Sequence, residues 1–287
     1  MSKIVALPAI TGAQQSAIAA RFRDAGWSVR GTSRTGAAGP AEATHRADLD
    51  TGEGLEAAFA GADVAVLTLP QDHRPGAVAR IAATVARAAG ASGLRRLVLN
   101  IAGTLDEDAA SGLSADLREA RQAVREGAAP FVVLQPTVFM DNLLAPWSLP
   151  AIVEQGVLAY PAPEAAPISW LSHRSLADYV FAAATAPDVA GQEFRIGGPE
   201  ALTGLDVCAR LSERLGRSIR YERIPLEGFA AGIDQAFGPP AGQRIASLYA
   251  RLESEPSAMA TDLATSDRLG VAPETFAAFV ARQSWGR

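Results

Sequence analysis

The sequence contains one cysteine and one lysine in 287 residues. Cys208 has no second thiol with which to form an internal disulfide. A chain of this length buries enough apolar surface to fold without such bridges, and few cysteines suit a reducing compartment. Because Lys3 is the one lysine, no Tyr-x-x-x-Lys sequence occurs. This absence excludes a catalytic tyrosine whose pKa is lowered by a lysine four residues further on.

Long apolar runs, basic clusters and paired metal ligands are also missing. No apolar run approaches the ~18 residues of a membrane span, and the first one ends at Pro8, too short for a signal peptide. The net charge of −5 and the lack of a basic run argue against nucleic-acid binding. His45, His73 and His173 have no second His or Cys at ligand spacing, which argues against a metal site.

No G-x-S-x-G sequence is present, so the nucleophile elbow of serine hydrolases is excluded. These absences together lead us to expect a cytoplasmic protein that acts on a small molecule. We expect a monomer or homodimer that binds no nucleic acid, membrane or metal.

Hydrophobic residues make up 48% of the chain, and in the first half they form short runs that alternate with amphipathic segments. Strands are expected at 4–7, 28–32, 44–47, 64–67, 97–99 and 131–134. Helices are expected at 12–25, 52–60, 75–89 and 114–126. Continuous apolar strands separated by helices are typical of a parallel sheet covered on both faces. The sequence therefore predicts an α/β fold with a doubly wound parallel sheet of the Rossmann type.

The alternation becomes irregular after residue 140, where prolines cluster. Helices are expected at 174–185, 203–215, 225–236, 240–253 and 274–283. We interpret residues 1–140 as a dinucleotide-binding region. We interpret residues 141–287 as a smaller, mixed substrate-binding lobe that is interleaved with the first region.

The first strand is followed by a turn over residues 9–15 that leads into a helix. Thr11, Gly12, Gln14 and Gln15 belong to this turn, and the N–H groups at the helix start suit a pyrophosphate. Gly12 is the one glycine in the turn, whereas a dinucleotide loop normally has three. The position of the turn, more than its composition, therefore indicates a nucleotide site.

Two further positions lie where the adenosine end of a nucleotide is expected. Arg34 follows Ser33 at the end of the second strand, and an arginine there suits the 2′-phosphate of NADP. The alternative is a solvated arginine in a loop. Asp48 follows the third strand and could accept a hydrogen bond from adenine, cap the helix expected at 52–60, or do both. Residues 71–74 are expected to form an exposed turn that caps the next helix.

Several separated segments resemble the NmrA-like family of atypical short-chain dehydrogenases. The turn at 9–15 is similar to the family's GATGxQG loop, and residues 47–50 resemble its GDLxD segment. Residues 135–144, QPTVFMDNLL, resemble its RPxxFMENLL box. Residues 168–177 and 197–203 resemble its ISxVSxRDLA and GPEALT segments. The resemblance extends along nearly the whole chain and implies the Rossmann-type fold.

The family includes NADPH:quinone oxidoreductases, triphenylmethane-dye reductases and redox-sensing regulators. The resemblance implies NADP(H) as the cofactor. The cofactor-binding residues that it implies are Thr11, Gly12, Gln14, Gln15, Ser33, Arg34, Asp48, Leu49, Leu69, Pro70, Asn100 and Ile101. If the protein transfers a hydride, we expect the acceptor pocket to be lined by Phe139, Met140, Asn142, Tyr160, Trp170 and His173. The alternative is that Phe139 and Met140 are core residues and His173 is a structural hydrogen-bonding group.

The sequence departs from the family pattern at several of these positions. Ala9 and Gln15 replace the first and third glycines of the nucleotide loop. The Gln15 side chain either obstructs a pyrophosphate or donates a hydrogen bond to it. Gln135 replaces the arginine before Pro136, and Ser175 replaces an aspartate.

Three functions are compatible with these observations. The first is an NADPH-dependent reductase that transfers a hydride to a quinone-like or other conjugated acceptor. Such transfer needs alignment of two rings, and solvent can supply the proton, so no catalytic residue is assigned. The second is a non-catalytic, NADP(H)-sensing regulatory protein. The third is an isomerase, cyclase or lyase that has kept the fold and lost the dinucleotide.

Overall fold

The structure is a computed structural model that describes residues 3–37, 39–70, 72–109 and 112–285. Its centre is a seven-stranded sheet in the order β3-β2-β1-β4-β5-β6-β9, with every neighbouring pair parallel. The strands are β1 (Ile4–Leu7), β2 (Ser28–Ser33), β3 (Ala43–Arg46), β4 (Val64–Thr68), β5 (Arg96–Asn100), β6 (Phe131–Pro136) and β9 (Gln192–Ile196). The strand order reverses between β1 and β4, which confirms the predicted doubly wound α/β fold.

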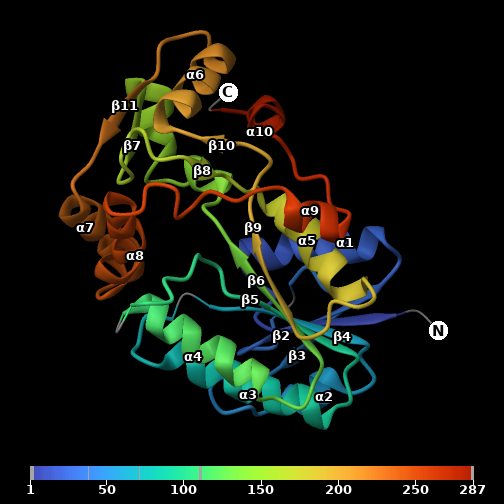
Figure 1. Ribbon diagram of the computed structural model, residues 1–287. Coiled ribbons are helices and arrows are strands. Elements are labelled where there is room, and N and C mark those ends of the chain that lie inside the picture. The colour runs from blue at the N-terminus through green and yellow to red at the C-terminus, as the bar shows by residue number, and fades with distance from the viewer. Residues whose placement is uncertain (1–2, 38, 71, 110–111, 286–287) are drawn as a thin grey trace.

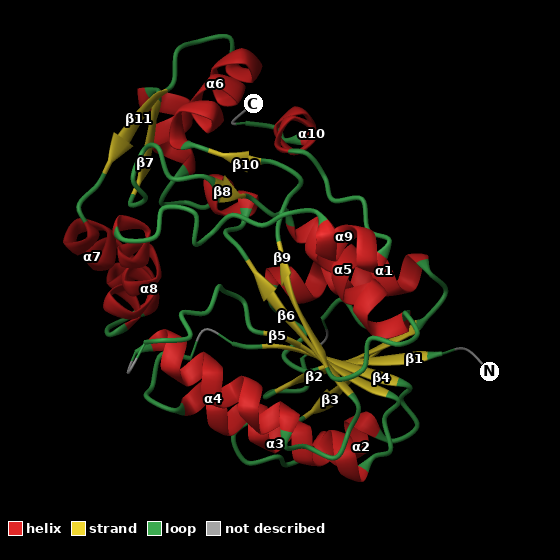
Figure 2. Cartoon of the chain, in the orientation of Figure 1, coloured by secondary structure: helices red, strands yellow, loops and turns green. Residues whose placement is uncertain are grey.

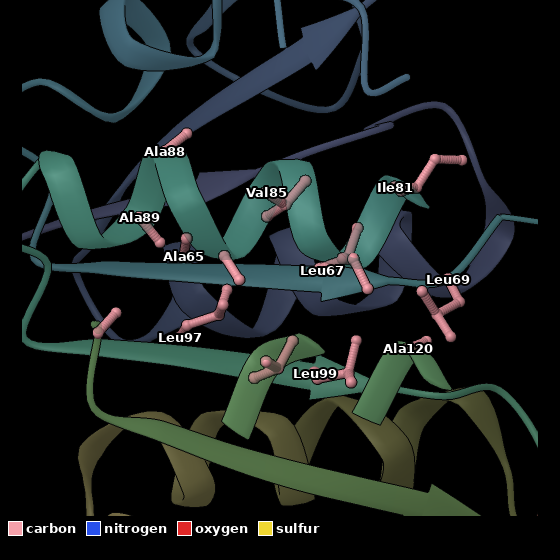
Figure 3. Close-up of a cluster of buried hydrophobic side chains, with 14 of the residues drawn as sticks. Ala65, Leu67, Leu69, Ile81, Val85, Ala88, Ala89, Leu97, Leu99 and Ala120 are labelled. Carbon is pink, nitrogen blue, oxygen red and sulfur yellow. The ribbon is translucent and has the colours of Figure 1, made fainter. Parts of the chain in front are cut away.

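Helices cover both faces of this sheet (Figures 1 and 2). One face carries α1 (Ala13–Asp24) and α5 (His173–Thr185). The other carries α2 (Leu55–Phe59), α3 (Ala77–Ala91) and α4 (Leu113–Arg125). Side chains of a strand alternate between the two faces, so Ala65 and Leu67 pack under α3 and α4 (Figure 3). Val64 and Val66 pack under α1 and α5, which explains why this strand is apolar at successive positions.

The second half of the chain contributes to the sheet and also forms a separate cluster of elements. It supplies strand β9, which pairs with β6, and helix α5, which covers one face of the sheet. The remaining strands form two pairs, β7 (Val157–Tyr160) with β11 (Arg220–Arg223) and β8 (Ile168–Ser169) with β10 (Ala201–Leu202). Around them lie η1 (Met140–Leu144), η2 (Ala151–Gln155), α6 (Gly204–Leu215), α7 (Leu226–Phe237), α8 (Ala241–Ala250), η3 (Arg251–Glu253), α9 (Ala264–Leu269) and α10 (Phe276–Arg282). Apart from α9, whose Leu269 packs in the cluster under α1 and α5, their apolar side chains form a third core cluster.

The structure differs from the sequence-based predictions in its short strands and helices. Strands β7 to β11 and helix α9 were not predicted, because they are short. β11, for example, reads Arg-Tyr-Glu-Arg and is largely exposed. The helix expected at 52–60 is limited to residues 55–59. Within the described residues, no helix is both long and apolar enough to cross a bilayer.

Asp48 does not cap this short helix. The residue at the N-cap of α2 is Gly54, whose φ of 79° is in the left-handed region. Asp48 instead closes a turn of its own, where Oδ1 accepts the N–H of Asp50 at 2.8 Å and that of Thr51 at 3.1 Å. The capping alternative was therefore wrong.

Candidate functional site

One buried amide side chain holds together the loops at the carboxyl edge of the sheet. Asn100 ends β5 and is fully buried. Its Nδ2 donates to Gln14 Oε1 at 2.8 Å and to Thr68 Oγ1 at 3.3 Å. Its Oδ1 accepts the N–H of Ala102 at 3.0 Å. These bonds join the start of α1, the end of β4 and the loop after β5 at the switch point, where doubly wound sheets bind ligands.

The turn between β1 and α1 has the backbone of a glycine-rich loop. Ala9 has a φ of 55°, in the left-handed region that glycine favours. Thr32 on β2 fastens the turn by accepting the N–H of Ala9 at its Oγ1 and that of Ile10 at its carbonyl, at 3.3 and 3.1 Å. Gly12 is the N-cap of α1, with no side-chain cap and no acidic residue in the first turn. The exposed N-terminus of α1 therefore suits an anion such as a pyrophosphate.

The Gln15 side chain lies beneath this turn. It is 2% exposed, and its Nε2 donates to the carbonyl of Pro8 at 2.8 Å and to that of Val66 at 3.2 Å. Both N–H groups of the side-chain amide therefore point into the protein interior. The polar side chain that replaces the third glycine is folded inward and leaves the outer surface of the turn open.

Arginines border the ends of β2 and β3. Arg34 is exposed and, within the part of the chain that is described, makes no side-chain hydrogen bond or ion pair. Arg46 is opposite Ser33 in the strand register and is also exposed. A Cβ built on Gly36 would lie 3.7 Å from the Arg46 Cβ, so Arg46 adjoins the loop that carries Arg34. Two guanidinium groups at one edge suit a phosphate monoester.

Arg46 was missed by the sequence analysis. It stands two residues before Asp48, at the end of the expected third strand. Strand pairing between β2 and β3 brings it beside Ser33, and that pairing is not visible in the local sequence. Leu49 lies near this edge and packs half-buried against the sheet core.

Side chains after β4 and β5 turn mostly into the core. Leu69 and Ile101 are 4% and 1% exposed, so only their backbone atoms remain at the edge of the site. The Leu69 N–H donates to the Asn100 carbonyl at 3.0 Å and fixes the path of the loop. Pro70 is half-buried at the rim.

The turn expected at 71–74 is not simply an exposed helix cap. Gln71 lies outside the described residues, and the N-cap of α3 is Gly76. Both ring nitrogens of His73 are buried and have no hydrogen-bond partner among the described residues. Burial, followed by the nearby charge of Arg244, lowers the pKa of His73, so the imidazole is held neutral.

His173 contacts Asp141 at the start of α5. It begins α5, and its backbone N–H donates to Asp141 Oδ2 at 2.9 Å. Its Nδ1 lies 3.4 Å from Asp141 Oδ1. Burial lowers the pKa of His173, and the charge of Asp141 opposes that effect. The Phe139 ring packs against the imidazole at 5.0 Å between centroids, within the cluster under α1 and α5.

The other expected acceptor residues lie in the third core cluster. Met140, Tyr160 and Trp170 are 1%, 7% and 3% exposed, and Asn142 is half-buried beside Tyr160. The Tyr160 hydroxyl shares a hydrogen bond of 2.7 Å with that of Tyr249, which the sequence analysis did not single out. Burial raises the pKa of both phenols, that of Tyr249 to about 12, so both stay protonated. Of the six expected residues, Phe139 thus lies in the cluster under α1 and α5, and Met140, Tyr160 and Trp170 lie in the third cluster.

A small hollow lies between the loop after β5 and α8. Its volume is about 10 Å³, and it is lined by Thr104, Asp106, Ser114, Ser247, Leu248, Arg251, Ala258 and Met259. Thr104 Oγ1 donates to the Pro136 carbonyl at 3.3 Å, which places the hollow over the ends of β5 and β6. None of these residues was predicted, because α8 reaches the sheet edge through tertiary contacts alone.

Curated proteins of known activity are similar to this chain. A (4-alkanoyl-5-oxo-2,5-dihydrofuran-3-yl)methyl phosphate reductase of Streptomyces griseus is 31% identical over 195 residues, or 66% of this chain and 64% of that protein. An NAD(P)H azoreductase of Xenophilus azovorans is 33% identical over 184 residues, or 64% of this chain and 62% of that protein. The matches therefore span less than two thirds of the length of these relatives.

Structural similarity extends further along the chain. The NADPH-dependent quinone oxidoreductase of Escherichia coli, solved in complex with NADPH, has a TM-score of 0.79. At 20% identity, with coverage of 96% of this chain and 98% of that one, this likeness establishes a shared fold. The family model described as the NmrA-like family matches residues 1–256. Because that match covers most of the chain, this protein belongs to the NmrA-like family.

Proposed function

We propose that this protein is an NADPH-dependent reductase that transfers a hydride to a conjugated small-molecule acceptor. The observation that carries the proposal is the placement of Arg34 and Arg46 at the edge of the sheet that also exposes the uncapped start of α1. Guanidinium groups and a helix N-terminus are complementary to the two phosphate sites of NADP(H). The reductase names of the two curated relatives agree with this function.

The residues present fit the dinucleotide. The N–H groups around Gly12 would hold the pyrophosphate, and Gln15 does not block them because its side chain is turned inward. Arg34 and Arg46 would hold the 2′-phosphate, with the turn of Asp48 on the adenine side. Pro70, Asn100 and the backbone of the following loops would face the nicotinamide end. Residues 1–140 would thus bind the cofactor, and residues 141–287 would supply most of the acceptor site.

When bound, the dinucleotide supplies the hydride. The chain itself supplies orientation, because Asn100 fixes the three loops that border the nicotinamide end. The buried hydroxyls of Tyr160 and Tyr249 bond to each other in the third core cluster, so we assign the proton to solvent. An acceptor whose hydride adduct is an anion stabilised by conjugation, as with a quinone, an aromatic azo compound or an unsaturated lactone, suits a site without an acid, because solvent can protonate that anion afterwards.

The proposal is tested by titrating the protein with NADPH and NADH and following cofactor fluorescence. Wild type should bind NADPH more tightly than NADH. Arg34→Glu should weaken NADPH binding by about 10- to 100-fold, because it removes one charge-assisted contact and adds repulsion. Arg95→Glu is the control, because Arg95 is exposed next to the opposite end of β5.

Turnover is tested by following NADPH absorbance in the presence of menadione or an azo dye. NADPH binding with acceptor-dependent oxidation supports the reductase. Binding without oxidation across the acceptor panel would favour the NADP(H)-sensing function. Undetectable binding of either dinucleotide would contradict both.

A further inference from the structure

Two adjacent sides of helix α8 contact different parts of the molecule. Arg244, Leu248 and Arg251 are spaced by four and three residues and lie on one side of α8 and its continuation η3. We call these three residues the closure face. The adjacent side carries Tyr249 and Leu252, which are buried in the third core cluster. α8 is thus anchored to the second half of the chain, against which Leu248 also packs in part, while Arg244 and Arg251 of the closure face bond to the first half.

The closure face makes polar contacts with the elements beside the sheet edge. Arg244 forms an ion pair of 2.5 Å with Asp116 of α4, and both side chains are largely buried. Arg251 Nη1 donates to the Leu105 carbonyl, in the loop after β5, at 2.8 Å. Figure 1 shows α7 and α8 side by side, with α8 above the end of α4. These contacts hold α8 against the first half of the chain.

The space beneath the closure face is too small for a substrate. Leu248 lies close to the loop after β5, where a Cβ built on Gly103 would be 3.8 Å from its Cδ1. The hollow at this contact has a volume of about 10 Å³, room for no more than a water molecule. Small-molecule sites usually hold ~300–1,000 Å³. An acceptor therefore needs α8 to withdraw from the ends of β5 and β6.

The closed contact leaves polar atoms unsatisfied. Arg244 Nε and both ring nitrogens of His73 are buried without hydrogen-bond partners among the described residues. Opening would return them to water, which favours the open state. The preceding helix α7 packs on α8, with Phe229 and Tyr249 5.3 Å apart between ring centroids, and Ile233 is its one buried residue. At the tip of α7, the contact of Phe237 with Trp147 joins two exposed side chains.

We propose that α8 is a gate whose closure face separates from α4 and the loop after β5 to admit the acceptor to the nicotinamide end. The Arg244–Asp116 pair is its latch. What the gate admits rests on the proposed function. The movement itself does not, and it is measurable in the protein without cofactor or acceptor.

The test is hydrogen–deuterium exchange, followed by mass spectrometry, of peptides that cover residues 241–253. Asp116→Asn removes the charge of the latch and should speed exchange of these peptides severalfold, while β5 keeps the wild-type rate. Asp178→Asn is the matched control, because it breaks an Arg–Asp pair of 2.7 Å between α5 and α1, on the other face of the sheet. The control should leave residues 241–253 unchanged.

Arg244→Gln should reproduce the effect of Asp116→Asn, and the double variant should add little, because both changes open one latch. The gate is overturned if residues 241–253 exchange as slowly as β5 in wild type and in both variants. It is equally overturned if Asp116→Asn speeds exchange in every element alike, since that result indicates global destabilisation. NADPH titration of the same samples is independent of these outcomes and reports on the proposed function separately.

Discussion

At the scale of single residues, the departures from the family's nucleotide loop are compensated locally. Ala9 adopts the left-handed backbone that glycine would adopt, at a cost of about 1 kcal/mol. Gln15 places its side chain in the interior, where its amide satisfies the carbonyls of Pro8 and Val66. The loop therefore keeps its shape with one glycine.

This interpretation predicts separate effects of Gln15→Ala on stability and binding. The change leaves two buried carbonyls without their donor, so the free energy of unfolding should fall by about 1–3 kcal/mol. The NADPH dissociation constant should change by less than about threefold, because the side chain does not face the outer surface of the turn. Urea unfolding and fluorescence titration, performed where the variant is folded, measure the two quantities.

Gln122→Ala is the control for Gln15→Ala, since Gln122 is bonded to Glu126 on the exposed side of α4. It should alter stability by less than about 0.5 kcal/mol. A loss of NADPH affinity greater than about tenfold in Gln15→Ala would show that this side chain takes part in cofactor binding.

At the scale of elements, we expect the junction between α8 and the loop after β4 to respond to pH. Burial and Arg244 lower the pKa of His73 below its ordinary value of 6.5, while Asp72 and Asp234 oppose this effect. Below that value, the unfolded chain binds a proton that the folded protein resists. Stability should therefore fall as the pH drops from about 6.5 towards the lowered pKa.

The pH effect is checked by thermal unfolding of wild type and His73→Gln between about pH 5 and 7.5. The variant should lose less stability than wild type on acidification. His45→Gln serves as the control, because His45 lies on β3, away from α8. Identical pH profiles for wild type and His73→Gln would contradict the assignment.

At the scale of the whole molecule, the two halves of the chain share one sheet. β9 pairs with β6 along residues 132–136, and α5 covers the same face as α1. Leu176 and Val180 of α5 are fully buried against the strands. Removal of residues 141–287 would expose this apolar face and leave the edge of β6 unpaired.

We therefore expect the fragment 1–140 to lack a cooperative unfolding transition and to bind a hydrophobic dye such as ANS. The full chain should unfold cooperatively and bind little dye. Circular dichroism during urea titration, together with dye fluorescence, distinguishes the two. A fragment that unfolds cooperatively and binds NADPH would show that the first half is an independent domain.

The sequence by itself determined the α/β alternation of the first half, the doubly wound fold and the position of the turn between β1 and α1. These follow from local apolar periodicity, which a strand or helix carries within its own residues. Only the tertiary structure placed β9 in the sheet, Arg46 beside the Arg34 loop, Gln15 beneath its turn and α8 over the ends of β5 and β6. These placements depend on strand pairing, side-chain rotation and contacts between residues far apart in the chain, which local periodicity does not encode.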